Sequence, residues 1–173
     1  MKLTAKSLGI FKSARSVKVE RTVTIEKTPE ELYRFWSNLE NLPRFMDHIE
    51  SLEKIDDKRS HWVVKGPMGL RIEWNSELTD QIENKQLGWR SIEGSQVESS
   101  GLVQFTPAPG GRGTEVKVTL TYHPPGGILG AKFAKFFGEE PSIQVRESLC
   151  RLKQLLEVGE IATLASQSFG RAR

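Results

Sequence analysis

The sequence predicts an α+β fold in which a seven-stranded antiparallel sheet wraps around a long C-terminal helix, with two short helices after the first strand. Three observations support this. Much of the chain between residues 17 and 122 alternates apolar and polar side chains, as half-buried strands do. Short turn-forming runs separate these segments. Residues 141–159 instead repeat apolar side chains at steps of three and four, which is typical of a helix with one buried face.

The first expected strand is 17–26, where valine and isoleucine alternate with charged and hydroxyl residues. Helical signals follow it directly. Thr28 can cap a helix whose first turn contains Pro29, and Glu31 stands at the capping-box position three residues after Thr28. We expect residues 41–43 to break this helix before a short second helix or turn.

Six further strands are expected at close spacing. Short runs rich in glycine, proline or charged residues separate them, and such connections join neighbouring antiparallel strands. The expected strands are 48–55, 59–66, 70–80, 86–93, 97–107 and 114–122. A short apolar helix is then predicted within residues 128–137.

The longest expected helix runs from Pro141 to a stop at Gly159. The lone cysteine, Cys150, lies in this helix and is expected to be buried or half-buried. An amphipathic helix must bury its apolar face, and the sheet is the element available to cover it. The side chains on that face are Val145, Leu149, Leu152 and Leu156.

Composition indicates a soluble globular protein, with 37% apolar and 27% charged residues. There is no run of 18 apolar residues, so we expect no membrane span. The N-terminal stretch lacks the continuous apolar segment of a secretory signal. One cysteine cannot form an intrachain disulfide, which fits a cytoplasmic location.

We expect a single domain at residues 17–160, between a basic tail at 1–16 and a C-terminal tail at 161–173. The net charge is +3, and the excess of cations lies before Glu20. Such a cluster could contact an anionic membrane or RNA. A solvated terminus is our preferred interpretation, and we do not expect a nucleic-acid partner. Nothing in the sequence indicates an oligomeric state.

Several segments resemble one protein family. They are RTVTIEKTPEELYRFWSNLENLPRFM, SHWVVKGPMG, IEWNSELT, LGWRS, SGLVQFTPAPGGRGTEVKVTL and YHPPGG…FFGEEP…VRESLCRLKQLLE, and they span about residues 17–160. Together they resemble the bacterial polyketide cyclase/dehydrase-like branch of the SRPBCC (START-like) superfamily. The resemblance implies a helix-grip fold with a largely hydrophobic cavity between sheet and C-terminal helix. Members include aromatase/cyclases, coenzyme Q-binding proteins and lipid-transfer proteins, so the fold alone does not select a function.

Alternation within each strand indicates which side chains share the concave face of the sheet. Three of the four tryptophans fall on this face, and aromatic side chains offer a large apolar contact area. A register shift of one residue would instead bring Arg71, Glu73, Asn75 and Arg90 into the cavity. The residues expected to bind a ligand are Trp62, Trp74, Ser76, Trp89, Ser91, Phe105, Tyr122, Phe133, Phe137, Val145 and Leu149.

No catalytic or metal-binding motif is evident. His48, His61 and His123 lack the spacing of metal ligands, and there is no GxSxG motif. The GGRG run at 110–113 lies in an expected hairpin, not between a strand and a helix where it could hold a phosphate. We therefore expect neither a metal nor a cofactor.

The favoured function is non-enzymatic binding of a hydrophobic small molecule, such as a lipid, a quinone or a polyketide-like compound. The first alternative is an aromatase/cyclase- or dehydratase-like enzyme. Tyr122, Ser76 or Ser91 would then have to transfer protons, although unperturbed tyrosine and serine are poor acids and bases at neutral pH. The second alternative is an interaction module that acts on a membrane or RNA through residues 1–16.

Overall fold

The computed structural model describes residues 16–65, 69, 71–95, 97–123 and 141–159. Seven strands form one antiparallel sheet in the order β1-β7-β6-β5-β4-β3-β2. The strands are β1 (Val17–Ile25), β2 (Ile49–Lys54), β3 (Arg59–Lys65), β4 (Arg71–Ile82), β5 (Gln86–Ser91), β6 (Glu98–Pro107) and β7 (Thr114–His123). The helices are α1 (Pro29–Ser37), α3 (Pro141–Val158) and two 3-10 helices, η1 (Leu39–Arg44) and η3 (Pro109–Gly111). The predicted α+β architecture is confirmed.

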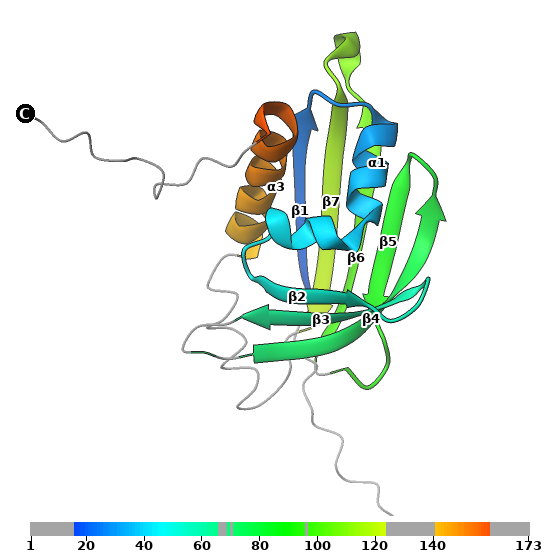
Figure 1. Cartoon of the computed structure of the whole chain (residues 1–173), viewed down its shortest axis with the longest axis vertical. Helices are drawn as coiled ribbons and strands as arrows, with labels where there is room; N and C mark the ends of the chain where they lie inside the picture. The colour runs from blue at the N-terminus through cyan, green and yellow to red at the C-terminus, as the bar shows by residue number, and fades with distance from the viewer. Residues whose placement is uncertain (1–15, 66–68, 70, 96, 124–140, 160–173) are drawn as a thin grey trace, which may run out of the picture.

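The sheet is strongly curved. Figure 1 shows β2 and β3 running across the direction of β1, β7 and β6, so that the two parts of the sheet enclose a concave side. The pairing of β4 with β5 is irregular between Leu78 and Gln81, and such irregularities bend a strand. At this bend a Cβ on Gly88 would lie 2.6 Å from the Thr79 hydroxyl, so only glycine fits without a shift.

The start of α1 follows the predicted capping box. The backbone N–H of Glu31 donates to the Thr28 hydroxyl at 3.2 Å, and the backbone N–H of Thr28 donates to the Glu31 carboxylate at 2.9 Å. The end of α1 comes earlier than the break expected at 41–43. Asn38 adopts an extended backbone and its side chain accepts from the N–H of Glu40, which ends α1 and begins η1.

A cluster of aromatic core residues lies where α1 and the segment after η1 meet β6. The ring of Trp36 lies 5.4 Å from that of Phe45 and 6.2 Å from that of Phe105, measured between centroids. Tyr33 contacts Phe105 edge to face at 6.2 Å. Aromatic pairs at these separations stabilise the core beyond the area that they bury, so α1 is held firmly on the sheet.

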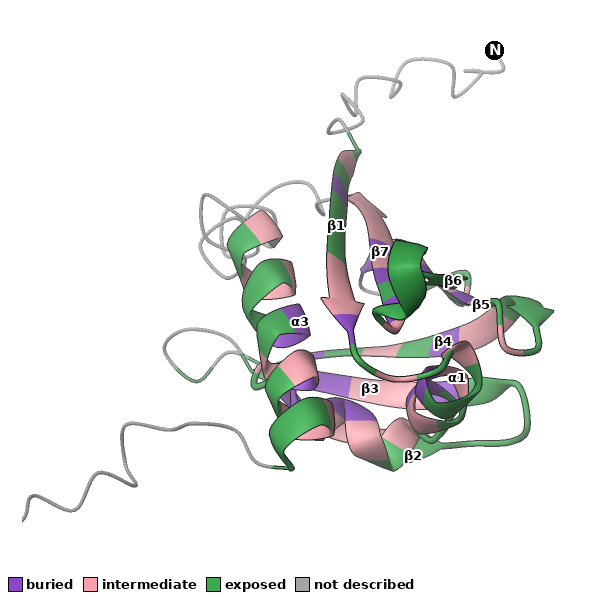
Figure 2. Ribbon diagram, turned by 90° about the horizontal axis from the view of Figure 1, so that it is seen from above, coloured by how far each residue is buried: buried purple, intermediate pink, exposed green. Residues whose placement is uncertain are grey.

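Helix α3 lies beside β1 with its buried residues toward the sheet (Figure 2). Leu149 and Leu152 are buried, as predicted from their spacing. The end of the helix is tied to β1, because Lys153 Nζ donates to the Thr24 carbonyl at 2.7 Å. Cys150, expected to be buried or half-buried, is exposed. Each helical residue is rotated about 100° from the last, which carries Cys150 away from the face of Leu149.

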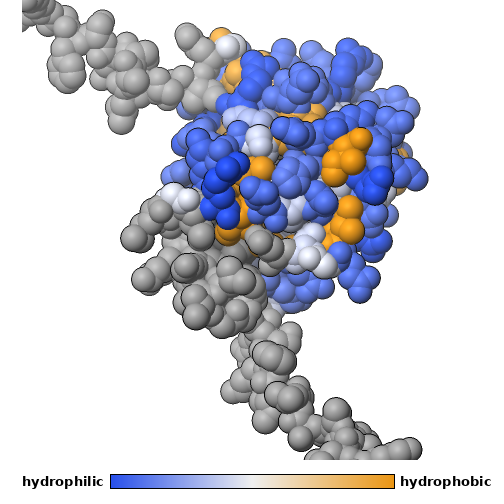
Figure 3. Space-filling view, turned by 60° about the horizontal axis from the view of Figure 1, so that its bottom comes forward, coloured by the Kyte–Doolittle hydropathy of each residue, from blue (hydrophilic) through white to orange (hydrophobic). Residues whose placement is uncertain are grey.

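The two tails and the helix predicted within 128–137 lie outside the described residues. The domain limits at 17 and 160 and the proposed role of residues 1–16 therefore stay predictions. None of the described helices is long and apolar enough to cross a lipid bilayer. Figure 3 shows a surface on which hydrophobic side chains are scattered among hydrophilic ones. The large hydrophobic side chains that are exposed are Ile55, Ile82, Ile143 and Val158.

Candidate functional site

A cavity of about 130 Å³ lies between the concave side of the sheet and the first half of α3. We call it the helix-side cavity. Most of its walls are aromatic or aliphatic, and they include residues from all seven strands, from α1 and from α3. Its lining residues are Val19, Trp36, Phe45, Met46, His48, Ile49, Trp62, Val64, Trp74, Trp89, Val97, Ser99, Val118, Leu120, Thr121, Tyr122, Gln144, Val145, Ser148 and Leu149.

Two tryptophans form one wall of this cavity as a stacked pair. Trp62 on β3 and Trp74 on β4 are direct cross-strand partners, and their rings stack with centroids 5.8 Å apart and an angle of 14°. The indole N–H of Trp62 donates to the hydroxyl of Ser60 at 2.9 Å. With this polar group satisfied, the pair presents mainly apolar surface.

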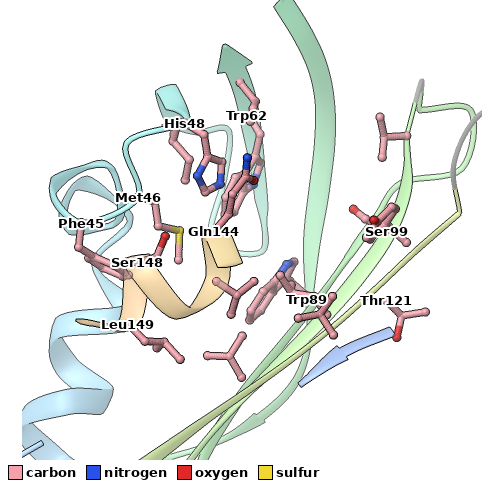
Figure 4. Close-up of a pocket in the computed structure, with 18 of the residues that line it drawn as sticks. Phe45, Met46, His48, Trp62, Trp89, Ser99, Thr121, Gln144, Ser148 and Leu149 are labelled. Atoms are coloured by element: carbon pink, nitrogen blue, oxygen red, sulfur yellow. The ribbon is translucent and has the colours of Figure 1, made fainter. Parts of the chain in front are cut away.

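A third tryptophan, Trp89, lies across β6. Its cross-strand partner is Gly101, and a Cβ at that position would overlap the Trp89 ring and press on Leu120. The absence of a side chain at Gly101 therefore lets the indole lie close to the strand. In Figure 4 Trp89 occupies the middle of the cavity.

The titratable imidazole at the cavity is that of His48, which directly precedes β2. Burial lowers the pKa of His48, the charge of Arg151 lowers it further, and the charge of Asp47 opposes the shift. The Asp47 carboxylate is itself paired with Arg151 at 2.5 Å. No hydrogen bond joins the imidazole to another described residue. His48 is therefore a neutral imidazole at pH 7, with a ring nitrogen able to accept a proton.

The other polar groups stand on two sides of the cavity. Figure 4 shows Gln144 and Ser148 of α3 on the side of His48, and Ser99 and Thr121 on the opposite side. Tyr122 also lines the cavity, and burial raises the pKa of its phenol. The Tyr122 hydroxyl thus stays protonated at neutral pH and is suited to donate a hydrogen bond, not to act as a base.

The family model "Polyketide cyclase / dehydrase and lipid transport" matches residues 25–150. The chain belongs to this family. A solved structure from Deinococcus radiodurans, DR_A0006, is 43% identical and has a TM-score of 0.67, covering 83% of this chain and 99% of that one. An uncharacterized 17.2 kDa protein of Streptomyces lincolnensis is 29% identical over 107 residues, which are 62% of this chain and 69% of that protein.

A START superfamily protein from Mycobacterium smegmatis shares the fold at 17% identity and a TM-score of 0.59, over 80% of this chain and 98% of that one. These comparisons confirm the resemblance to the polyketide cyclase/dehydrase family and the predicted helix-grip fold. The helix-side cavity of this family member lies where the resemblance implied it, between the sheet and the C-terminal helix.

More than half of the predicted ligand-binding residues line this cavity: Trp62, Trp74, Trp89, Tyr122, Val145 and Leu149. They meet there because strand alternation and helical spacing place them on facing surfaces. The predicted assignment of faces holds for β3 and β4, since Trp62 and Trp74 are cross-strand partners and both line the cavity. The alternative shifted register does not occur, and its residues Arg71, Glu73, Asn75 and Arg90 are exposed.

The remaining predicted residues lie elsewhere. Ser76 is buried, lines a second hollow described below, and donates its hydroxyl to the Arg90 carbonyl at 2.9 Å. The hydroxyl of Ser91 accepts from the N–H of Ser99 at 2.9 Å. Phe105 fills the core under α1, because β6 passes below that helix at this point. Both serines are thus occupied by the backbone. Phe133 and Phe137 lie outside the described residues.

Sequence reasoning missed His48, Met46, Gln144 and Ser148. The last two carried a signal, because each directly precedes a predicted cavity residue of α3 and so lies at the edge of the same helical face. His48 and Met46 carried none, since their direction depends on how the segment between η1 and β2 folds. Among the described residues, no three histidine, cysteine or acidic side chains gather as a metal site would require.

Proposed function

We propose that this protein binds a hydrophobic small molecule in the helix-side cavity. The observation that supports this most directly is a hollow enclosed by sheet and helix whose walls are aromatic and aliphatic. Burying an apolar ligand there would contribute roughly 25 cal/mol for each Å² removed from water, less the cost of ordering it. A lipid, a quinone or a polyketide-like compound has the apolar body that such walls favour.

The polar groups of the cavity support a ligand with a few oxygen atoms. Gln144 and Ser148 stand beside His48 at one side of an otherwise apolar wall. A few polar groups in a mostly apolar pocket orient a ligand, while the apolar area supplies the affinity. A carbonyl or hydroxyl group of the ligand is therefore expected to lie toward the start of α3.

Binding can be tested with N-phenyl-1-naphthylamine, an uncharged apolar probe whose fluorescence rises in an apolar environment. Val145→Gln places an amide in the cavity, whereas Val158→Gln makes the same change on the exposed end of the same helix. We expect Val145→Gln to weaken binding about tenfold, the effect of losing one buried valine, and Val158→Gln to leave it unchanged.

Native mass spectrometry of the protein as purified provides a second test, because a retained lipid or quinone would appear as a discrete added mass. Absence of both a retained species and any probe binding would refute the proposal. Equal weakening by the two glutamine variants would place the probe outside the cavity.

A second candidate is acid–base catalysis on a ligand held in the same cavity, and His48 is the observation that favours it. A neutral imidazole in an apolar hollow can remove a proton from a carbon next to a ligand carbonyl, a step that cyclisation and dehydration both use. Tyr122 and a group such as Gln144 could donate hydrogen bonds to the resulting enolate oxygen.

This candidate is tested by hydrogen–deuterium exchange at the carbon next to the carbonyl of a weakly acidic monoketone, 2-indanone, in D₂O, followed by NMR. General base catalysis typically contributes 10²- to 10⁴-fold, so exchange should accelerate with the wild type and lose that gain in His48→Gln. His61→Gln is the matched control, because His61 is bonded to Asn75 on the outer face of the sheet. Acceleration that survives in His48→Gln, or none with the wild type, would count against it.

A further inference from the structure

A second hollow, of about 560 Å³, lies between η1, the β2–β3 hairpin and the adjoining parts of β4 and β5. We call it the hairpin-side cavity. Its deep part is apolar and includes Leu39, Leu42, Leu52, Leu78 and Leu87. Its rim is formed by charged side chains of the hairpin turn, so the hollow combines a hydrophobic floor with a polar mouth.

The two cavities share a wall. Trp36, Met46, Trp62 and Trp89 line both of them, so the cavities are separated by a single layer of side chains. Met46 is half-buried and comes from the segment between η1 and β2. Methionine is unbranched and adapts to irregular spaces, which makes Met46 the member of this wall that can move aside most readily.

The volumes show why one cavity is not enough for a ligand of the proposed class. A cavity of roughly 150 Å³ takes up a single benzene ring, so the 130 Å³ of the helix-side cavity fits one ring or the end of a chain. Pockets for larger organic ligands measure about 300–1,000 Å³. The hairpin-side cavity, at about 560 Å³, falls within that range.

We propose that the two cavities are the two ends of one binding site for an elongated amphiphile. This proposal rests on the binding function proposed above. The mainly apolar end, with any carbonyl or hydroxyl it carries beside Gln144 and Ser148, lies in the helix-side cavity. The body passes the wall at Met46, and the polar head lies at the rim of the hairpin-side cavity. This orientation matches the apolar walls of the first cavity and the charged mouth of the second.

The charges at the rim select the polar end. Lys54 is paired with Asp57 at 2.8 Å, and Arg59 with Asp56 at 2.6 Å. Two opposite charges this close act on a more distant ligand group as a dipole, so each of these ion pairs adds no net charge to the rim.

Glu77 is likewise paired, with Arg90 at 2.7 Å. Among the described residues, the rim groups left without an ion pair are Lys58 and two carboxylates, Glu40 and Glu53. The excess is negative, so the polar end that fits carries no negative charge: it is uncharged or cationic.

A chain-length series tests the joined site. Straight-chain 1-alkanols from butanol to decanol would compete with N-phenyl-1-naphthylamine for the wild-type protein. Each buried methylene is worth roughly fourfold in affinity, and we expect this rise to continue past six carbons. A plateau at about six carbons would overturn the joined site but leave the proposed function standing, whereas no competition at any length, with no probe binding, would refute both.

Reversing the rim charges tests where the polar end lies. We expect wild-type protein to bind decyltrimethylammonium more tightly than decanoate, and the double variant E40K/E53K to shift that preference about tenfold toward decanoate. The control E93K/E115K makes the same net charge change at exposed glutamates that line neither cavity. A shift of equal size in both double variants, or none in E40K/E53K, would overturn the assignment of the polar end.

Discussion

The core beneath α1 and the core beneath the first half of α3 are built from the same kinds of side chain but are filled differently. Under α1, Phe105 is 3% exposed and lines neither cavity, whereas Phe45 is fully buried and Trp36 is 4% exposed although each has one side on the helix-side cavity. Under α3, Trp62 and Trp74 are only half-buried and border a hollow. The number of aromatic side chains therefore does not decide whether a core is solid.

The difference comes from what faces the sheet. Helix α1 brings Trp36 onto the strands and the segment after η1 adds Phe45, so large rings meet at the centroid distances of close packing. Helix α3 brings Val145 and Leu149, with Gln144 and Ser148, over indoles that stack on each other or lie along a strand. Short side chains opposite flat rings leave space between helix and sheet. Because the sheet is curved, α3 does not approach it closely enough to fill that space.

The largest effect is expected where the filled core is emptied. Phe105→Ala should lower the free energy of unfolding by about 3–5 kcal/mol, because the buried ring leaves a cavity that its neighbours cannot fill. Trp74→Ala should lower it by about 2 kcal/mol, since its half-buried ring already borders a hollow. Urea unfolding followed by circular dichroism measures both. Equal losses would break the contrast between the two regions.

In the region that borders the cavity, we expect an effect from the opposite change, the addition of one methyl group. Gly101→Ala is expected to push the Trp89 ring toward the middle of the cavity, weakening binding of N-phenyl-1-naphthylamine about tenfold and lowering stability by about 1–3 kcal/mol. Ser100→Ala, on the exposed face one residue earlier, should alter neither. Unchanged binding in Gly101→Ala would show that the Trp89 position does not define the cavity.

A smaller and purely structural effect is expected at the start of α1. Thr28→Ala removes the side chain that accepts from the N–H of Glu31 and should lower the free energy of unfolding by about 1 kcal/mol. Thr28→Ser keeps the hydroxyl and should therefore retain most of the wild-type free energy of unfolding. Binding of N-phenyl-1-naphthylamine should be the same in all three proteins, because Thr28 caps α1 and does not line the cavity. Weaker binding in Thr28→Ala but not in Thr28→Ser would show that the cap of α1 affects the cavity.

The smallest effect concerns pH. Burial lowers the pKa of His48, so below the ordinary value of about 6.5 the unfolded chain binds a proton that the folded protein does not. The neutral His48 therefore contributes fully to the free energy of unfolding above pH 6.5. This contribution is lost as the pH falls from 6.5 toward the lower pKa that His48 has in the folded protein. Between pH 7 and pH 6 the loss is at most about 0.7 kcal/mol.

His48→Gln should lack this component, while the groups that the two proteins share cancel in the difference. Urea unfolding at closely spaced pH values measures it. A difference between wild type and variant that stays constant from pH 7 to pH 5 would mean that His48 is solvated, and would remove the basis for its role as a base.

What the sequence determined by itself is local or periodic. The capping box at Thr28 depends on residues within one turn, and the strands and α3 were predicted to within a few residues because each follows a repeat of two or of three to four. That Trp62 and Trp74 share the concave face also followed from alternation, since a shift of one residue would have buried charged side chains.

Only the tertiary structure decided how the concave face is divided between core and cavity. Phe105 shares that face with the tryptophans but lies under α1, and His48 reaches the cavity through a segment with no regular repeat. The wall between the two cavities joins residues from α1, β3, β5 and the segment before β2. Such positions depend on the bend of the sheet and on which helix covers each part of it, and these result from contacts between distant residues that no local pattern encodes.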